Sequence, residues 1–185
     1  VPTVHKEGGL VDDAWYTEEG RLRGKHVHAA CHYLDEGTLD WEDFQTRLPG
    51  LVGYVRGYEK FKAETGFKPI FLIEKPLFHP ALKFAGTPDR FGINGQGVLW
   101  LPDLKTGKPE PWAGVQTAAY EELVRNHYIA ETLDRPIIRL AVELREEGDY
   151  RAHWFKDRYD WAVFQSAYNV ANWKAQHKNG GRYVD

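Results

Sequence analysis

The sequence predicts an α/β domain in which helices flank a mixed central sheet. Segments with helical periodicity alternate with short apolar, strand-like segments, and glycines stand where several of them end. Two turn signals predict antiparallel hairpins. The length of 185 residues suits one domain with a real core and leaves little room for two. We therefore expect a single domain over residues 1–185.

The first third of the chain is expected to be helical. Residues 24–36 (GKHVHAACHYLDE) show helical spacing, and Gly37 is suited to end that helix. A second helix is expected over residues 40–65, broken or bent near Pro49 and Gly50 and ended by Gly66.

Three strands are expected next, because the period changes to that of extended chain. They span residues 69–74, 83–93 and 98–105. Asn94 and Gly95 stand between the last two strands, and both residue types tolerate positive φ. This favours a hairpin that pairs the second strand with the third.

The remaining chain is expected to form a helix over residues 113–127, a hairpin of strands 136–144 and 150–155, and a closing helix over residues 158–177. The closing helix carries aromatic residues on roughly one side. Core packing is the favoured role for them, with stacking on nucleic acid as the alternative. These residues are Trp161, Phe164, Tyr168 and Trp173.

Composition limits the classes of function. Hydrophobic residues make up 42% of the chain, yet no run approaches the roughly eighteen apolar residues of a membrane span, and no signal-peptide pattern is visible. We expect a soluble, cytoplasmic protein without a membrane partner. The single cysteine, Cys31, excludes an internal disulfide and a four-thiolate zinc or iron–sulfur site. The net charge of −3 does not indicate a nucleic-acid partner, although residues 21–25 (RLRGK) are locally basic.

Three acids are expected to converge on the three-stranded unit. Glu74 ends the first strand, Asp89 lies in the second, and Asp103 lies on the third. The hairpin brings Asp89 and Asp103 into one region, and the two-residue spacing points Asp103 and Lys105 to the same face. A buried ion pair would explain Asp103 and Lys105, but it would leave the other acids unexplained.

Several carboxylates and one lysine around one point suit phosphodiester hydrolysis. The acids can hold one or two divalent metal ions, which lower the pKa of a bound water and offset charge on the phosphate. The lysine can stabilise that charge or orient the water. Hard oxygen ligands favour Mg²⁺ or Mn²⁺ over zinc.

Four short motifs follow one another along the chain. They are Gly24–x–x–x–His28, Gly86–Thr–Pro–Asp89, Asp103–Leu–Lys105–Thr–Gly107 and Gln116–x–x–x–Tyr120. In this order they resemble the motifs of the RecB-like branch of the PD-(D/E)XK nucleases, in the form of a stand-alone, phage-type exonuclease. Each motif alone is weak, whereas the ordered set is specific.

The resemblance implies a restriction-endonuclease-like core and a role for each matching residue. Asp89 and Asp103 would bind the metal ion, and Glu74 and His28 would complete its ligands directly or through water. Lys105 would assist the attacking water or the scissile phosphate.

The resemblance also implies that Gln116 and Tyr120 position DNA or support the lysine. Arg90, Lys108 and Trp112 are further candidates for contact with DNA. Relatives often carry four cysteines for an iron–sulfur cluster, which this chain cannot bind, so Mg²⁺ or Mn²⁺ is the expected cofactor.

Structural alternatives remain for several of these residues. His26 and His32 compete with His28, although His26 lies about 200° around the helix from it and His32 about 6 Å along the axis. Glu74 can be a surface acid at a strand end, and Gln116 with Tyr120 a pair on a helix surface. Lys108 can be a solvated turn residue, and Trp112 a packing residue.

The function expected from the resemblance is a metal-dependent deoxyribonuclease, in particular an exonuclease that acts on DNA ends in recombination or repair. Its partners would be DNA and a recombinase or single-strand-binding protein, in a bacterial or phage-infected cell. The alternatives are a structure-specific or nicking endonuclease and a non-catalytic nucleic-acid-binding module. The intact Asp–x–Lys segment argues against the last, because clustered acids without a metal ion repel phosphate.

Overall fold

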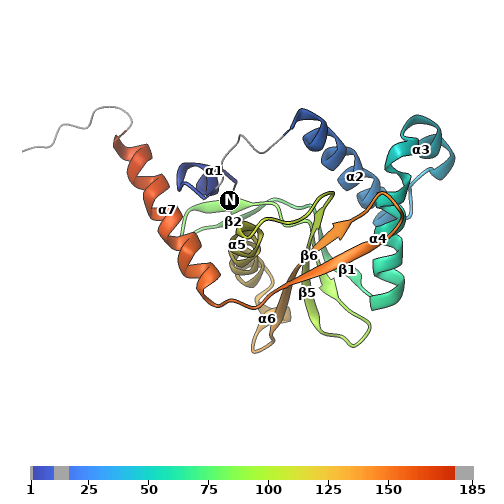
Figure 1. The fold of residues 1–185 in the computed structure, drawn as a ribbon. Helices are drawn as coiled ribbons and strands as arrows, with labels where there is room; N and C mark the ends of the chain where they lie inside the picture. The colour runs from blue at the N-terminus through green and yellow to red at the C-terminus, as the bar shows by residue number, and fades with distance from the viewer. Residues whose placement is uncertain (1, 11–16, 178–185) are drawn as a thin grey trace, which may run out of the picture.

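A five-stranded mixed sheet forms the centre of the protein (Figure 1). The structure, a computed structural model, describes residues 2–10 and 17–177. The strands are β1 (Lys68–Ile73), β2 (Leu77–His79), β3 (Phe84–Gly86), β4 (Arg90–Ile93), β5 (Leu99–Lys105), β6 (Ile137–Leu144) and β7 (Tyr150–Phe155). The helices are α1 (Pro2–Glu7), α2 (Glu18–Glu36), α3 (Trp41–Arg47), η2 (Pro49–Leu51, a 3-10 turn), α4 (Val52–Thr65), α5 (Trp112–His127), α6 (Ile129–Thr132) and α7 (Tyr159–His177).

The sheet has the strand order β1-β4-β5-β6-β7, and β2 and β3 form a separate two-stranded sheet. Strand β5 pairs antiparallel with β4 and parallel with β6, and β7 is antiparallel to β6. Helix α5 makes the crossover that a parallel pair requires. The predicted fold class, α/β with a mixed sheet between helices, is confirmed.

Helices cover both faces of the sheet. Helices α2 and α4 pack on one face, where Trp100 and Leu104 of β5 enter their core cluster. Helices α5 and α7 pack on the other face, together with Leu99 and Leu101. Strand β5 therefore alternates between two buried faces, as a central strand does.

The predicted helix ends at Gly37 and Gly66 are confirmed, but one helix begins earlier than expected. Gly37 and Gly66 both adopt the left-handed conformation after their helices. Helix α2 begins earlier than expected, at Glu18, because the side chain of Thr17 caps its first turn. The break expected near Pro49 and Gly50 is confirmed, since the segment over residues 40–65 is divided there into α3, η2 and α4.

The prediction of a single strand over residues 83–93 was wrong, because the structure has two separate strands there, β3 and β4. Residues 87–89 interrupt it, since Pro88 has no N–H to donate to a ladder. Strand β2, which pairs with β3, was not predicted. The hairpin between β4 and β5 is confirmed, but its positive φ falls on Gly97 (76°).

The aromatic residues of α7 belong only partly to the core. Phe164 is buried, and Trp161 and Tyr168 pack against the same cluster. Trp173 is 57% exposed and stacks on His177, so its predicted core position was wrong. Among the described residues, no helix is both long and apolar enough to cross a membrane.

Candidate active site

The site begins where helix α2 lies against the end of β5. His28 Nε2 lies 3.0 Å from the carbonyl oxygen of Leu104, which can only accept a hydrogen bond, so this nitrogen carries the hydrogen. The opposite ring nitrogen, Nδ1, faces two carboxylates. It lies 3.5 Å from Glu74 Oε1 and 3.6 Å from Asp89 Oδ1.

This arrangement requires a positive charge at Nδ1. A neutral ring with its hydrogen on Nε2 would direct the Nδ1 lone pair at two anions, so either a proton or a metal ion must lie between them. Burial alone would lower the pKa of His28, but Asp89, Glu74 and Asp103 raise it to about 9.

Glu74 directly follows β1 and has an unusual backbone. Its φ is 44°, in the left-handed region that residues with a Cβ avoid, and its N–H donates to the carbonyl oxygen of Asp89 at 2.8 Å. Burial would raise the pKa of the Glu74 carboxyl, but the hydrogen bond with His28 and the charge of Arg90 lower it to about 2. The carboxylate is therefore ionised at neutral pH.

Asp89 comes from the segment that interrupts the expected strand. Its Oδ2 accepts a hydrogen bond from the Leu104 N–H at 2.6 Å, which leaves Oδ1 toward His28. A pocket of about 570 Å³ opens beside these groups. It is lined by Gly24, Lys25, His28, Ala29, Glu74, Thr87 and Asp89.

Lys105 joins the other predicted residues into one chain of contacts. Its Nζ lies 2.7 Å from Asp103 Oδ2 and donates to Gln116 Oε1 at 3.1 Å. Gln116 Nε2 then donates to the Tyr120 hydroxyl at 3.1 Å. The strand pair and the helix pair that the sequence singled out therefore face each other.

Asp103 is almost fully buried at the start of this chain. In the described part of the molecule its Oδ2 has no well-aligned hydrogen bond, although the Lys105 ammonium is within ion-pair distance. The short distance shows that the two charges interact, so we treat them as paired. Burial raises the pKa of Asp103 above its ordinary value, with Lys105 opposing that shift and Asp89 adding to it.

The three residues proposed for DNA contact lie in different environments. Lys108 is exposed in the segment between β5 and α5. Trp112 is half-buried, and the Lys105 ammonium lies 5.5 Å from its ring centroid. Arg90 is fully buried and bound to acids, so the prediction that it contacts DNA was wrong.

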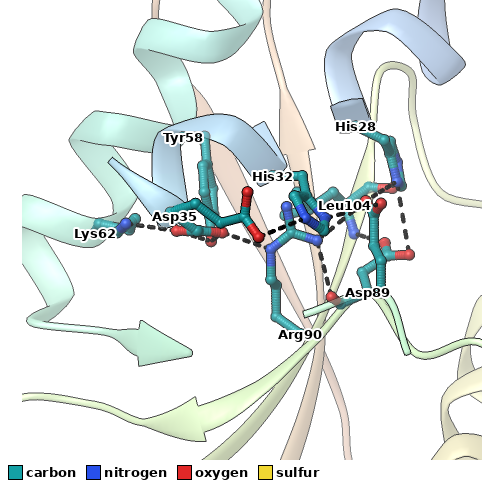
Figure 2. A network of polar contacts seen from close by, with 10 residues as sticks. His28, His32, Asp35, Tyr58, Lys62, Asp89, Arg90 and Leu104 are labelled. Atoms are coloured by element: carbon teal, nitrogen blue, oxygen red, sulfur yellow. Dashed lines mark hydrogen bonds and ion pairs between the residues drawn. The ribbon is translucent and has the colours of Figure 1, made fainter. Parts of the chain in front are cut away.

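Sequence reasoning missed a buried network behind the site (Figure 2). The network runs from Lys62 through Asp35 and Arg90 to Asp89 and His28. The detectable signal was Asp35 itself, since an acid one turn after the buried Cys31 lies close to the core-facing side of its helix.

His32 also contributes more than the sequence indicated. Its Nδ1 lies 3.5 Å from Glu74 Oε2, and its Nε2 lies 3.2 Å from Glu36 Oε1. His28 and His32 therefore flank the two oxygens of one carboxylate.

The donor atoms can be compared with the needs of a divalent ion. Within residues 2–10 and 17–177, no group of three or more His, Cys, Asp or Glu side chains could hold a metal ion as the side chains stand. Adjacent ligands of Mg²⁺, with bonds of about 2.1 Å, lie about 3.0 Å apart. His28 Nδ1 lies 3.5 and 3.6 Å from the two carboxylate oxygens, so side-chain shifts of about 0.5 Å would bring each of these two nitrogen–oxygen distances to that spacing.

The chemistry of these donors fits Mg²⁺ or Mn²⁺. One imidazole nitrogen and carboxylate oxygens suit these ions, the nitrogen favouring manganese. A metal-binding His commonly donates its other ring N–H to a backbone carbonyl, which is the contact that His28 makes with Leu104.

No protein-family model and no curated protein matches the chain. A crystal structure from Eubacterium rectale, described as a "putative exonuclease", aligns with a TM-score of 0.49 and 17% sequence identity, over 96% of this chain and 73% of that one. A similarity of this size carries no functional argument.

Proposed function

We propose that this protein is a metal-dependent deoxyribonuclease of the RecB-like branch of the PD-(D/E)XK nucleases, formed as a single domain. One observation carries the proposal. The His28 Nδ1 atom lies within 3.6 Å of carboxylate oxygens from two other parts of the chain, Glu74 and Asp89, beside a pocket. Such a convergence of ionised groups costs free energy and is typical of a functional site.

Four residues would hold the divalent ion: His28, Glu74, Asp89 and Asp103. When bound, Mg²⁺ or Mn²⁺ lowers the pKa of a water and offsets charge on the phosphate. The low pKa of Glu74 keeps that carboxylate ionised for this role, and the Leu104 carbonyl holds the ring of His28 with Nδ1 toward the acids.

Lys105 would stabilise charge on the scissile phosphate or orient the attacking water. Its side chain is 24% exposed, so the ammonium can meet a substrate while Gln116 and Asp103 hold it. A fixed ammonium is effective because its position needs no reorganisation as charge develops.

We further propose that the enzyme is an exonuclease acting on DNA ends in recombination or repair, in a bacterial or phage-infected cell and together with a recombinase or single-strand-binding protein. The ordered sequence motifs support this assignment. Lys108 and Trp112 are proposed to contact the DNA.

The test uses DNA of two topologies with Mg²⁺. We expect end-labelled linear duplex to be degraded and covalently closed circular DNA to remain intact, with Asp103→Asn protein as the inactive control. Nicking of the circle would identify an endonuclease instead. Binding of DNA without cleavage in either metal would identify a non-catalytic module.

A further inference from the structure

The Asp35–Arg90 ion pair lies behind the candidate site and is unusually deep. Arg90 begins β4 with 0% exposure, and the side chain of Asp35 is also 0% exposed. Replacing a buried ion pair with apolar residues of similar size is often neutral or stabilising. The stability of the fold therefore does not by itself account for this pair.

Asp35 holds the guanidinium of Arg90 in place. Its carboxylate accepts hydrogen bonds from Arg90 Nε at 2.6 Å, the Tyr58 hydroxyl at 2.9 Å and Lys62 Nζ at 2.5 Å (Figure 2). Three donors from two elements, β4 and α4, fix the carboxylate, and the planar guanidinium has little freedom against it.

The other end of the guanidinium reaches both acid-bearing segments of the site. Arg90 Nη1 donates to Glu74 Oε1 at 3.1 Å and to the carbonyl oxygen of Asp89 at 2.8 Å. That carbonyl also accepts the Glu74 N–H, so Arg90 and Glu74 meet at one oxygen. The left-handed backbone of Glu74, which is unfavourable for a residue with a Cβ, is thus held by contacts to Arg90 and Asp89.

Arg90 makes these contacts at the expense of one donor. In the described part of the chain its Nη2 is buried without a hydrogen-bond partner. A buried donor left unpaired is destabilising. The guanidinium is therefore oriented so that it binds Asp35, Glu74 and Asp89, although this orientation leaves one of its own N–H groups without a hydrogen bond.

We propose that Arg90 is a positioning residue of the metal site. Arg90 fixes the Glu74 carboxylate and the Asp89 backbone in the geometry that metal binding needs, and Asp35 orients the Arg90 guanidinium. Arg90 contacts neither the metal ion nor the DNA. This inference rests on the proposed function, because it concerns the same metal ligands.

The experiment measures Mn²⁺ binding directly, by calorimetry and by the electron paramagnetic resonance signal of free Mn²⁺. Arg90→Met alone leaves the Asp35 charge buried without its main partner and can unfold the protein. The informative protein is therefore the triple variant Asp35→Leu, Tyr58→Phe, Arg90→Met, which removes the Asp35 and Arg90 charges and the Tyr58 hydroxyl together and leaves only the partly exposed Lys62 ammonium. We expect it to melt cooperatively and to bind Mn²⁺ at least tenfold more weakly than wild type.

Arg90→Lys is the second variant, and it decides the question if the triple variant does not fold. Lysine keeps the charge, but its single ammonium cannot reproduce the planar fork that reaches Asp35 and Glu74 together. We expect this variant also to lose at least tenfold in Mn²⁺ affinity.

Arg139→Met is the matched control. Arg139 is similarly buried and pairs with Glu121 and Asp160, on the face of the sheet that α5 and α7 cover. We expect it to lower the melting temperature and leave Mn²⁺ affinity unchanged.

Two results would overturn the inference while leaving the proposed function intact. One is a folded triple variant, or Arg90→Lys protein, that binds Mn²⁺ as wild type does. The other is an equal loss of affinity in the Arg139→Met control, which would make the effect one of general stability. A wild-type protein that binds no Mn²⁺ would instead refute the proposed metal site, and this inference with it.

Discussion

Gln116 offers a sharp test of how the helix α5 residues act. It is 7% exposed and links Lys105 to Tyr120 through two hydrogen bonds of 3.1 Å. Gln116→Leu keeps a similar volume and removes both bonds. Lys105 would then be held by Asp103 and the ring of Trp112.

The size of the effect follows from the lost contact. A hydrogen bond to a charged group contributes about 1.5–3 kcal/mol. If it orients the ammonium in the transition state, its loss slows cleavage by roughly 10- to 150-fold. The Tyr120 hydroxyl, left buried, should also reduce stability by about 1–3 kcal/mol, and adding Tyr120→Phe should recover stability without recovering the rate.

The assay is single-turnover cleavage of labelled DNA at saturating enzyme, combined with a double-mutant cycle. If Gln116 supports Lys105, then Gln116→Leu should change little in a Lys105→Met background, because the group it orients is gone. If Gln116 binds DNA directly, the two losses should add and DNA affinity should fall. The supporting role would be refuted if the free-energy losses of Gln116→Leu and Lys105→Met were fully additive. It would also be refuted if Gln116→Leu left the cleavage rate of the saturated complex unchanged.

Four further outcomes follow from the proposed site. Activity should require Mg²⁺ or Mn²⁺ and disappear in excess EDTA, and cleavage that survives EDTA would exclude the metal mechanism. Ca²⁺ should bind but support little turnover, because its looser geometry aligns water and phosphate poorly. Asp103→Asn and Lys105→Ala should each slow cleavage about 100-fold or more, but only Asp103→Asn should shift the metal concentration that activity requires. Cleavage at the wild-type rate in both variants would refute the site. His28→Ala should weaken Mn²⁺-supported activity more than Mg²⁺-supported activity, whereas His26→Ala should leave both nearly intact; the rate against metal concentration for folded variants decides this. Because the pKa of His28 is about 9 and its proton must leave before Nδ1 can bind a metal ion, Mn²⁺ affinity should rise with pH. The rise should be about tenfold per unit between pH 7 and 8.5 in wild type, and an equal slope in His28→Ala would disprove the assignment.

Much of the fold could be predicted from the sequence, because it depends on near neighbours. The helix ends at Gly37 and Gly66 follow from the ability of glycine to adopt positive φ. The alternation along β5 follows from the two-residue period of a strand, which also placed Asp103 and Lys105 on one face.

The grouping of the site residues was also predictable in outline. The ordered motifs contain His28 and Asp89, and Glu74 was predicted as the acid that ends the first strand. The structure brings a carboxylate oxygen of Glu74 and one of Asp89 within 3.6 Å of His28 Nδ1. The link from Lys105 to Gln116 required the crossover helix to fold back on its own strand, which a short connection favours.

The tertiary structure alone decided which charges are buried and what holds them. Arg90 follows the Gly86–Asp89 motif and was predicted to contact DNA, yet it is buried and pairs with Asp35, 55 positions earlier in the chain. Trp173 continues an aromatic pattern, but no described element covers it strongly enough to bury it. Periodicity and turn chemistry act over a few residues and can be read locally, whereas the desolvation of a charge depends on how distant segments pack around it.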